Sequence, residues 1–215
     1  MPARRSSLVE EGEPADVIAR TVRELGCELV VTGIARDETL GRFLLGTTVD
    51  RLLRRMHIPV LVVRGRARAA YRNIIVTTDF SDASLGALRM AADLFPAQAL
   101  NVFHAYQPPL AQFSDDSGRL AREYRRVPEQ DCAAFLERFR AGAATVPSLQ
   151  TWIEHGDVVP LLEEFVDERG IDLLVLGTRG QNALAEMLIG STATRILLAL
   201  PCDALVVPGA RRAVS

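Results

Sequence analysis

Short runs of apolar residues alternate with amphipathic stretches along most of the chain. The runs are continuous rather than alternating, which is typical of strands buried on both faces of a parallel sheet. They predict strands at 73–79, 99–106, 151–154, 172–177 and 203–207. Helical spacing between them predicts helices at 81–95, 129–141 and 191–200, and one that ends at Gly170, whereas 107–127 should form a surface loop. This alternation predicts an α/β fold, a doubly wound parallel sheet of flavodoxin-like order 3-2-1-4-5 with right-handed crossovers.

Part of this pattern occurs twice. Residues 10–65 match residues 154–209 without a gap, at an offset of 144, with roughly a third of the positions identical. The first copy has the helix ending at Gly26, the strands 28–33 and 59–63 and the helix 47–56, but it lacks the opening strand, helix and strand. We therefore predict a partial domain at 1–65, a linker at 66–72 and a complete domain at 73–209.

The first copy should depend on the second for stability. A fragment of this size is only marginally stable alone. In a sheet of order 3-2-1-4-5, the missing strands 1 and 2 lie between strands 3 and 4. The segment Ser6 to Glu10, at the third strand position, is therefore left without a neighbouring strand. Its last strand, Val60 to Val63, is apolar and would form an exposed sheet edge. We expect it to pair with Ala204 to Val207, either within the chain as a pseudo-dimer or across a homodimer.

Composition excludes several classes of function. The net charge is −2 with acids and bases interspersed, so no broad positive surface for nucleic acid or lipid is expected. No run approaches the ~20 apolar residues of a membrane span, and the N-terminus lacks the apolar stretch of a signal peptide, which predicts a cytoplasmic protein. All 25 basic residues are arginines, so a Walker A or Schiff-base lysine is impossible. The three cysteines and three histidines show no metal-ligand spacing.

A ladder of glycines follows the fourth predicted strand of the complete copy. Gly177-Thr-Arg-Gly180 is followed after nine residues by Gly190-Ser191. Glycines let backbone amides approach a phosphate, and a helix N-terminus adds a favourable dipole. Each glycine alone is more often a turn residue, and Ser191 could be only a helix cap. The first copy has Arg36 in place of the second glycine, so it is expected to be scaffold.

Three separated segments carry a resemblance to a known family. They are the strand 73–79 with Phe80-Ser81, the pair Gly156-Asp157, and the segment from Asp172 through the glycine ladder to Val207. In this combination the chain resembles the universal stress protein family, over 72–209 as a whole domain and 10–65 as a partial one. The resemblance implies a tandem member with a truncated first domain. It also implies binding of ATP, or of ADP or AMP, with Mg²⁺ as a companion of the nucleotide.

The resemblance also implies positions for the site. The acid that ends the first strand is Asp79, and Thr77 and Ala105 would line the adenine slot, where proline and valine are more common in the family. The remaining positions carried over are Leu176, Gly177, Gly180, Gly190, Ser191 and Thr192.

The leading hypothesis is a nucleotide-dependent regulatory module of the stress response with one site, in the second domain. The alternative is a nucleotide-free dimerisation or adaptor module whose glycine loop is purely structural. An enzyme that transfers a phosphoryl group is a weaker third reading, because no general base or metal carboxylates can be identified, so slow ATP hydrolysis is the most that is expected.

Overall fold

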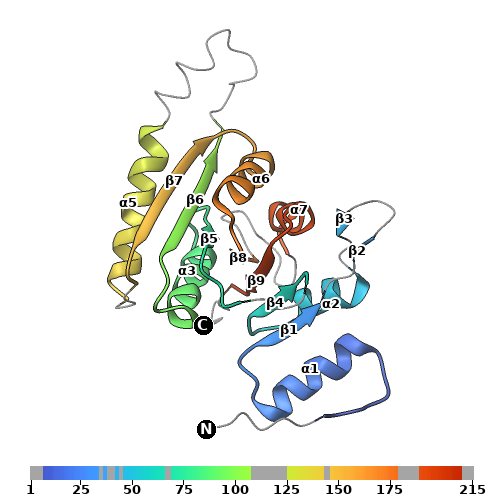
Figure 1. Ribbon diagram of the computed structural model, residues 1–215. Coiled ribbons are helices and arrows are strands. Elements are labelled where there is room, and N and C mark those ends of the chain that lie inside the picture. The colour runs from blue at the N-terminus through green and yellow to red at the C-terminus, as the bar shows by residue number, and fades with distance from the viewer. Residues whose placement is uncertain are drawn as a thin grey trace.

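The computed structural model describes residues 7–33, 36–37, 42–43, 46–65, 69–107, 125–142, 146–178 and 189–209. Its main element is a seven-stranded sheet in the order β1-β4-β9-β8-β5-β6-β7 (Figure 1). The strands are β1 (Val30–Gly33), β4 (Val60–Val63), β5 (Ile74–Thr77), β6 (Leu100–Tyr106), β7 (Leu149–His155), β8 (Leu173–Gly177) and β9 (Asp203–Val207). The helices are α1 (Pro14–Leu25), α2 (Thr47–Arg55), α3 (Asp82–Leu94), α5 (Arg126–Arg140), α6 (Val158–Arg169) and α7 (Ser191–Ala199). The short strands β2 (Arg36–Asp37) and β3 (Arg42–Phe43) form a separate pair within the described part of the chain.

The predicted fold class is confirmed. Strands β7-β6-β5-β8-β9 have the order 3-2-1-4-5, and every neighbouring pair among them is parallel. Most of these strands bury both faces, as their continuous apolar runs require. The element bounds differ from the prediction by a few residues: β7 is longer than 151–154, and α5 begins at Arg126 instead of 129. Nearly all of the predicted loop 107–127 lies outside the described residues.

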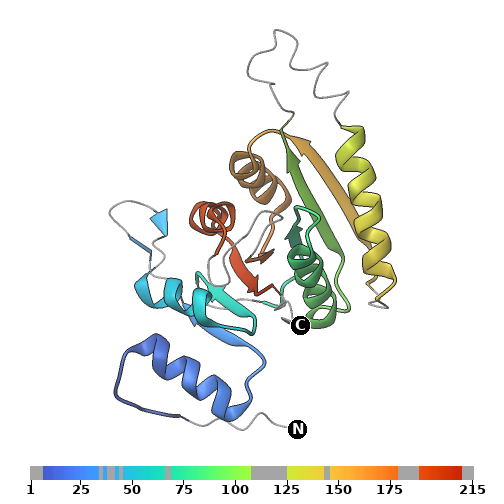
Figure 2. The same cartoon turned by 180° about the vertical axis from the view of Figure 1, so that it is seen from behind.

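Helices cover the two faces of the sheet in separate layers (Figures 1 and 2). On one face, α1, α2, α6 and α7 share a continuous core that includes Leu52, Val62, Leu162 and Val206. On the other face, α3 and α5 pack over the strands of the second half, residues 69–209. The first half, residues 7–65, has no described helix on that face.

The internal repeat is preserved in three dimensions. Helix α1 lies 144 residues before α6 and α2 lies 144 residues before α7, with matching bounds. Gly26 and Gly170 end α1 and α6 in the same left-handed conformation, with φ of 63° and 57°. The repeat in the sequence therefore corresponds to a structural repeat of a helix-strand-helix-strand unit.

The two copies join through their last strands, within the chain. Strand β4 pairs antiparallel with β9, with Val60 opposite Val206 and Val62 opposite Ala204. At the centre, Leu61 lies opposite Leu205, which is its own counterpart in the repeat. A local twofold axis therefore passes through this pair. The apolar edge of Val60 to Val63 is therefore covered by β9, which is one of the two pairings that the sequence predicted.

One arginine adds a polar contact at the same junction. Nε of Arg64, just after β4, donates to the carbonyl of Cys202 over 2.6 Å, and its Nη2 donates to the carbonyl of Leu197 in the last turn of α7. Asp203 accepts hydrogen bonds from the Arg64 amide at 2.7 Å and from the Tyr71 hydroxyl at 2.7 Å. Burial lowers the pKa of Arg64 and raises that of Tyr71. A partly buried cation at a helix C-terminus is favoured by the helix dipole, so this contact fastens the first half to α7.

Candidate functional site

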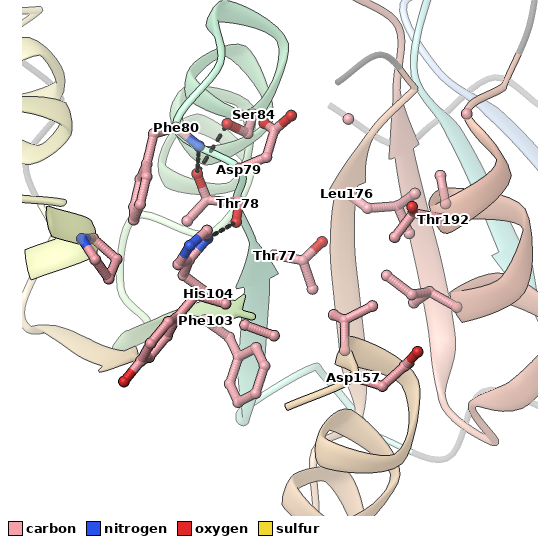
Figure 3. A pocket seen from close by; sticks show the side chains of 18 of the residues that line it. Thr77, Thr78, Asp79, Phe80, Ser84, Phe103, His104, Asp157, Leu176 and Thr192 are labelled. Atoms are coloured by element: carbon pink, nitrogen blue, oxygen red, sulfur yellow. Dashed lines mark hydrogen bonds between the residues drawn. The ribbon is translucent and has the colours of Figure 1, made fainter. Parts of the chain in front are cut away.

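A cleft of about 1030 Å³ opens at the carboxyl ends of β5, β6 and β8, where the order of the strands reverses. This is the place where doubly wound sheets bind ligands. The N-termini of α6 and α7 complete its walls. Figure 3 shows Asp79 and His104 on one side, Leu176 and Thr192 on the other, and Thr77 between them.

Eight of the nine predicted site residues line this cleft: Thr77, Asp79, Ala105, Leu176, Gly177, Gly190, Ser191 and Thr192. The ninth, Gly180, lies outside the described residues, and so does the side chain of Arg36 in the first copy. The fold therefore brings Thr77 and Asp79 to the same cleft as Gly190 and Ser191, although more than a hundred positions separate them in the sequence. Their contact with a nucleotide stays a prediction.

The loop that carries Asp79 is held by its neighbours. Thr78 is buried; its hydroxyl donates to Ser84 Oγ at 2.9 Å and accepts from the Phe80 amide at 2.9 Å. The carboxylate of Asp79 accepts from the Ser81 amide at 3.1 Å, and Ser81 caps α3. The backbone of Phe80 is left-handed, with a φ of 64°, which is unusual for an aromatic residue. These bonds fix the turn that places Asp79 at the cleft.

A neutral imidazole lies beside this turn. Nδ1 of His104 is 2.8 Å from the carbonyl oxygen of Thr78, so Nδ1 carries the proton and donates. The ring of Phe80 covers the imidazole, with the ring centroids 4.2 Å apart. Burial lowers the pKa of His104 below its ordinary value. At neutral pH His104 therefore adds no positive charge to the cleft.

The helix caps lie one residue before the hydroxyls that would be expected to form them. Thr47 and Ser191 have side chains typical of a cap, but the caps are Gly46 and Gly190, and neither provides a side-chain bond. Ser191 and Thr192 are the first helical residues and are exposed in the cleft. Thr47 and Ser191 are instead the first residues inside their helices. A glycine cap leaves the first-turn amides without a competing side-chain acceptor.

An ion pair that sequence reasoning missed spans the cleft wall. Asp157 caps α6 by accepting from the Val159 amide at 3.0 Å, and Arg195 Nη2 on α7 lies 3.0 Å and 3.1 Å from its two carboxylate oxygens. The Val159 amide, and then Arg195, hold the pKa of Asp157 below its usual value. The pair joins the two helices whose N-termini face the cleft. Gly156-Asp157 was recognised as a motif, but its partner 38 residues later gives no sequence signal.

Among the described lining residues, acids outnumber bases. Asp79, Asp131 and Asp157 line the cleft, and Arg195 is the cation that accompanies them. The described residues contain no group of three or more histidine, cysteine or acidic side chains arranged to hold a metal ion. None of the helices that the structure describes is long and apolar enough to cross a membrane.

The sequence profile of the universal stress protein family matches residues 3–64 and 70–208. The chain belongs to this family. It is 28% identical over 148 residues to a putative universal stress protein of Staphylococcus haemolyticus, covering 64% of this chain and 84% of that one. It is 26% identical over 141 residues to a universal stress protein of Methanocaldococcus jannaschii, covering 64% and 82%.

Solved structures show the same fold. A functionally unknown protein of Pseudomonas aeruginosa superposes with a TM-score of 0.68 at 21% identity, covering 93% of this chain and 69% of that one. A universal stress protein of Archaeoglobus fulgidus gives a TM-score of 0.66 at 19% identity, covering 93% and 68%. The universal stress protein UspA of Lactobacillus plantarum gives 0.55 at 25% identity, covering 65% and 99%.

Proposed function

We propose that this universal stress protein binds an adenine nucleotide, ATP or its products ADP and AMP, at one site in the second half. The observation that carries the proposal is the glycine-capped N-terminus of α7, which faces the same cleft as Asp79. Amides at a helix N-terminus bind phosphate, and a carboxylate at the end of β5 can accept hydrogen bonds from ribose hydroxyls.

The lining suits both ends of such a ligand. Phe103, Ala105 and Leu176 provide apolar surface for a base, and Ser191 and Thr192 add hydroxyls beside the helix amides. Ala105 is small, which widens the base slot and is expected to weaken packing rather than to move the site. In the first half, no described strand occupies the position of β5, so the acid that would face its glycine Gly46 is missing. One site is therefore proposed.

The excess of carboxylates in the cleft bears on whether the nucleotide binds with or without a metal ion. A triphosphate carries several negative charges, and Asp79, Asp131 and Asp157 would repel it. A divalent cation bound to the phosphates neutralises part of that charge. We therefore expect the Mg²⁺ complex to bind more tightly than free ATP, with the metal supplied by the ligand and not by a protein cage.

The role proposed for the bound nucleotide is regulatory. The described residues hold no group of three or more histidine, cysteine or acidic side chains that could bind a catalytic metal ion, so ligand-dependent conformation or partner choice is favoured over fast catalysis. The competing module, which would dimerise without nucleotide, would need a surface other than the last strands, because β9 already pairs with β4 of the same chain.

The test compares two equivalent glycines. Gly190→Val places a side chain at the phosphate position, and among the described atoms an added Cβ meets nothing closer than the Thr178 carbonyl at 3.7 Å, so the fold should tolerate it. Gly46→Val makes the same change in the first copy, where no described atom lies within 4 Å of the added Cβ. ATP with Mg²⁺ at a hundred times its dissociation constant should stabilise the wild type by about 2.7 kcal/mol.

That stabilisation corresponds to a rise in melting temperature of about 5–11 °C. Gly46→Val should keep the rise and Gly190→Val should lose it, with both unliganded variants melting close to the wild type. Native mass spectrometry should also detect retained nucleotide in the purified wild-type protein. An empty protein that shows no thermal shift at millimolar ATP with Mg²⁺, or an unchanged shift in Gly190→Val, contradicts the proposal.

A further inference from the structure

Among the described residues, the first half leaves exposed a surface that the second half covers. In the second half, β8 pairs along one edge with β5, and α3 lies over β8 and β9. Strand β1, the counterpart of β8, lies at the edge of the sheet and pairs only with β4 among the described strands (Figure 1). A strand edge without a partner is a template for adding another strand.

The face beside this edge is apolar. Leu29 is 37% exposed and Val31 is 60% exposed, whereas their counterparts Leu173 and Val175 under α3 are fully buried at 0%. Leu61 and Val63 on β4 are half-buried, whereas Leu205 and Val207 are buried beneath α3. We name Leu29, Val31, Leu61 and Val63 the open face. Within 28–33 only Glu28 is charged, so the edge carries little of the charge that usually protects such strands.

Gly33 shows what the surface is shaped to receive. At its counterpart Gly177, an added Cβ would lie 3.0 Å from the backbone carbon and oxygen of Ala83, because the start of α3 approaches β8 closely. At Gly33, the nearest atom would be the carbonyl oxygen of Val63 at 4.0 Å. The glycine that permits a helix to approach is thus present where the described chain places no helix.

We propose that the β1 edge and the open face form a docking site for a strand–helix segment of another polypeptide. A short apolar strand would pair parallel to β1, as β5 pairs with β8, and the amphipathic helix that follows would cover the open face. The start of that helix would contact Gly33. The chemistry of the partner is that of residues 70–97 of this chain, an Ile-Ile-Val strand followed by a helix with alanines on its buried side.

A second copy joined edge to edge fits the surface less well. Two β1 strands related by a twofold axis could pair antiparallel, but each open face would stay without a helix, because neither copy brings one there. The strand–helix segment covers edge and face together, as the second half demonstrates with its own residues. The proposal is independent of nucleotide binding, since the cleft lies on the other side of the β4–β9 junction.

The test uses the protein of residues 1–215 and a fluorescent peptide with the sequence of residues 70–97. Fluorescence anisotropy should show saturable binding to the wild type, and hydrogen exchange should show protection of the β1 amides. Gly33→Ala should melt like the wild type yet bind the peptide at least tenfold more weakly. Val31→Asp should also lose binding, whereas Leu94→Asp, at a 43% exposed site in the second half, should keep it.

A scrambled peptide of the same composition serves as the specificity control and should not bind. The proposal is overturned if the wild type fails to bind the peptide. It is also overturned if Gly33→Ala binds the peptide as tightly as the wild type does, because the peptide would then bind at another surface. It is also overturned if sedimentation shows a wild-type dimer that Val31→Asp dissociates. The open face would then be a contact between copies of this chain.

Discussion

Replacing Arg64 tests whether the two halves unfold as one unit. Arg64→Met keeps much of the apolar stem but removes the guanidinium bonds to the carbonyls of Leu197 and Cys202. A hydrogen bond to a charged group contributes about 1.5–3 kcal/mol. Burial of the guanidinium, which its lowered pKa reflects, offsets part of that gain. We expect a net loss of about 3 kcal/mol in the free energy of unfolding.

Urea denaturation followed by two probes gives the measurement. Trp152 on β7 is the only tryptophan of the chain, so its fluorescence reports the second half, whereas far-UV circular dichroism reports helices of both halves. In the wild type the two transitions should coincide. In Arg64→Met, the dichroism transition should begin at lower urea, because the first half is too small to be stable after its junction weakens.

An exposed arginine provides the matched control. Arg125 pairs with Glu129 at 2.9 Å, and both side chains are about half exposed. Such an i,i+4 pair contributes about 0.3–0.5 kcal/mol. Arg125→Met should therefore shift both probes slightly and together. If Arg64→Met is no more destabilising than Arg125→Met, the guanidinium does not fasten the halves, and the apolar β4–β9 contact is sufficient.

Two further predictions concern the second half. Gly177→Ala should cost about 1–3 kcal/mol of unfolding free energy in urea denaturation, because its Cβ would collide with the Ala83 backbone; an equal effect of Gly33→Ala would contradict this. Burial raises the pKa of the Cys202 thiol from 9.0 to about 11, so the neutral thiol is the folded form. Its stabilising contribution, about 2–3 kcal/mol, should be complete below pH 9 and lost between pH 9 and 11. Cys202→Ala should flatten that part of the stability profile, and an unchanged slope would exclude the thiol as its cause.

The sequence predicted the sheet order because the central strands β9, β8 and β5 are continuous apolar runs and each crossover is a helix of ordinary length. The candidate site residues came from the family resemblance, and the sheet order explains why they lie close together, since carboxyl ends of strands in such a sheet converge at one edge. Asp79 and Gly190 therefore reach one cleft, although 111 positions separate them in the sequence. The order of the strands is sufficient to explain this convergence, without any knowledge of individual contacts.

Contacts between side chains were beyond such reasoning. Arg64 and Tyr71 stand at the ends of a segment that resembled a linker, yet both reach Asp203, and that convergence depends on how β4 meets β9. The cap of α7 was misplaced because Ser191 matches the usual preference for a hydroxyl, and a glycine cap has no positive sequence signal of its own. Pairing of Asp157 with Arg195 depends likewise on the angle between two helices.

The local twofold axis at Leu61 and Leu205 has a consequence for how this protein can vary. Where two identical chains meet on such an axis, every substitution enters the interface twice. Here both sides belong to one chain, so each position can change alone. The two sides of the junction do differ in sequence. The counterpart of Arg64 is Pro208, and the counterpart of Asp203 is Pro59. The arginine contact therefore exists on one side of the axis only. With both strands in one chain, a symmetric contact has become directional, because Arg64 of one half bonds to the last turn of α7 in the other.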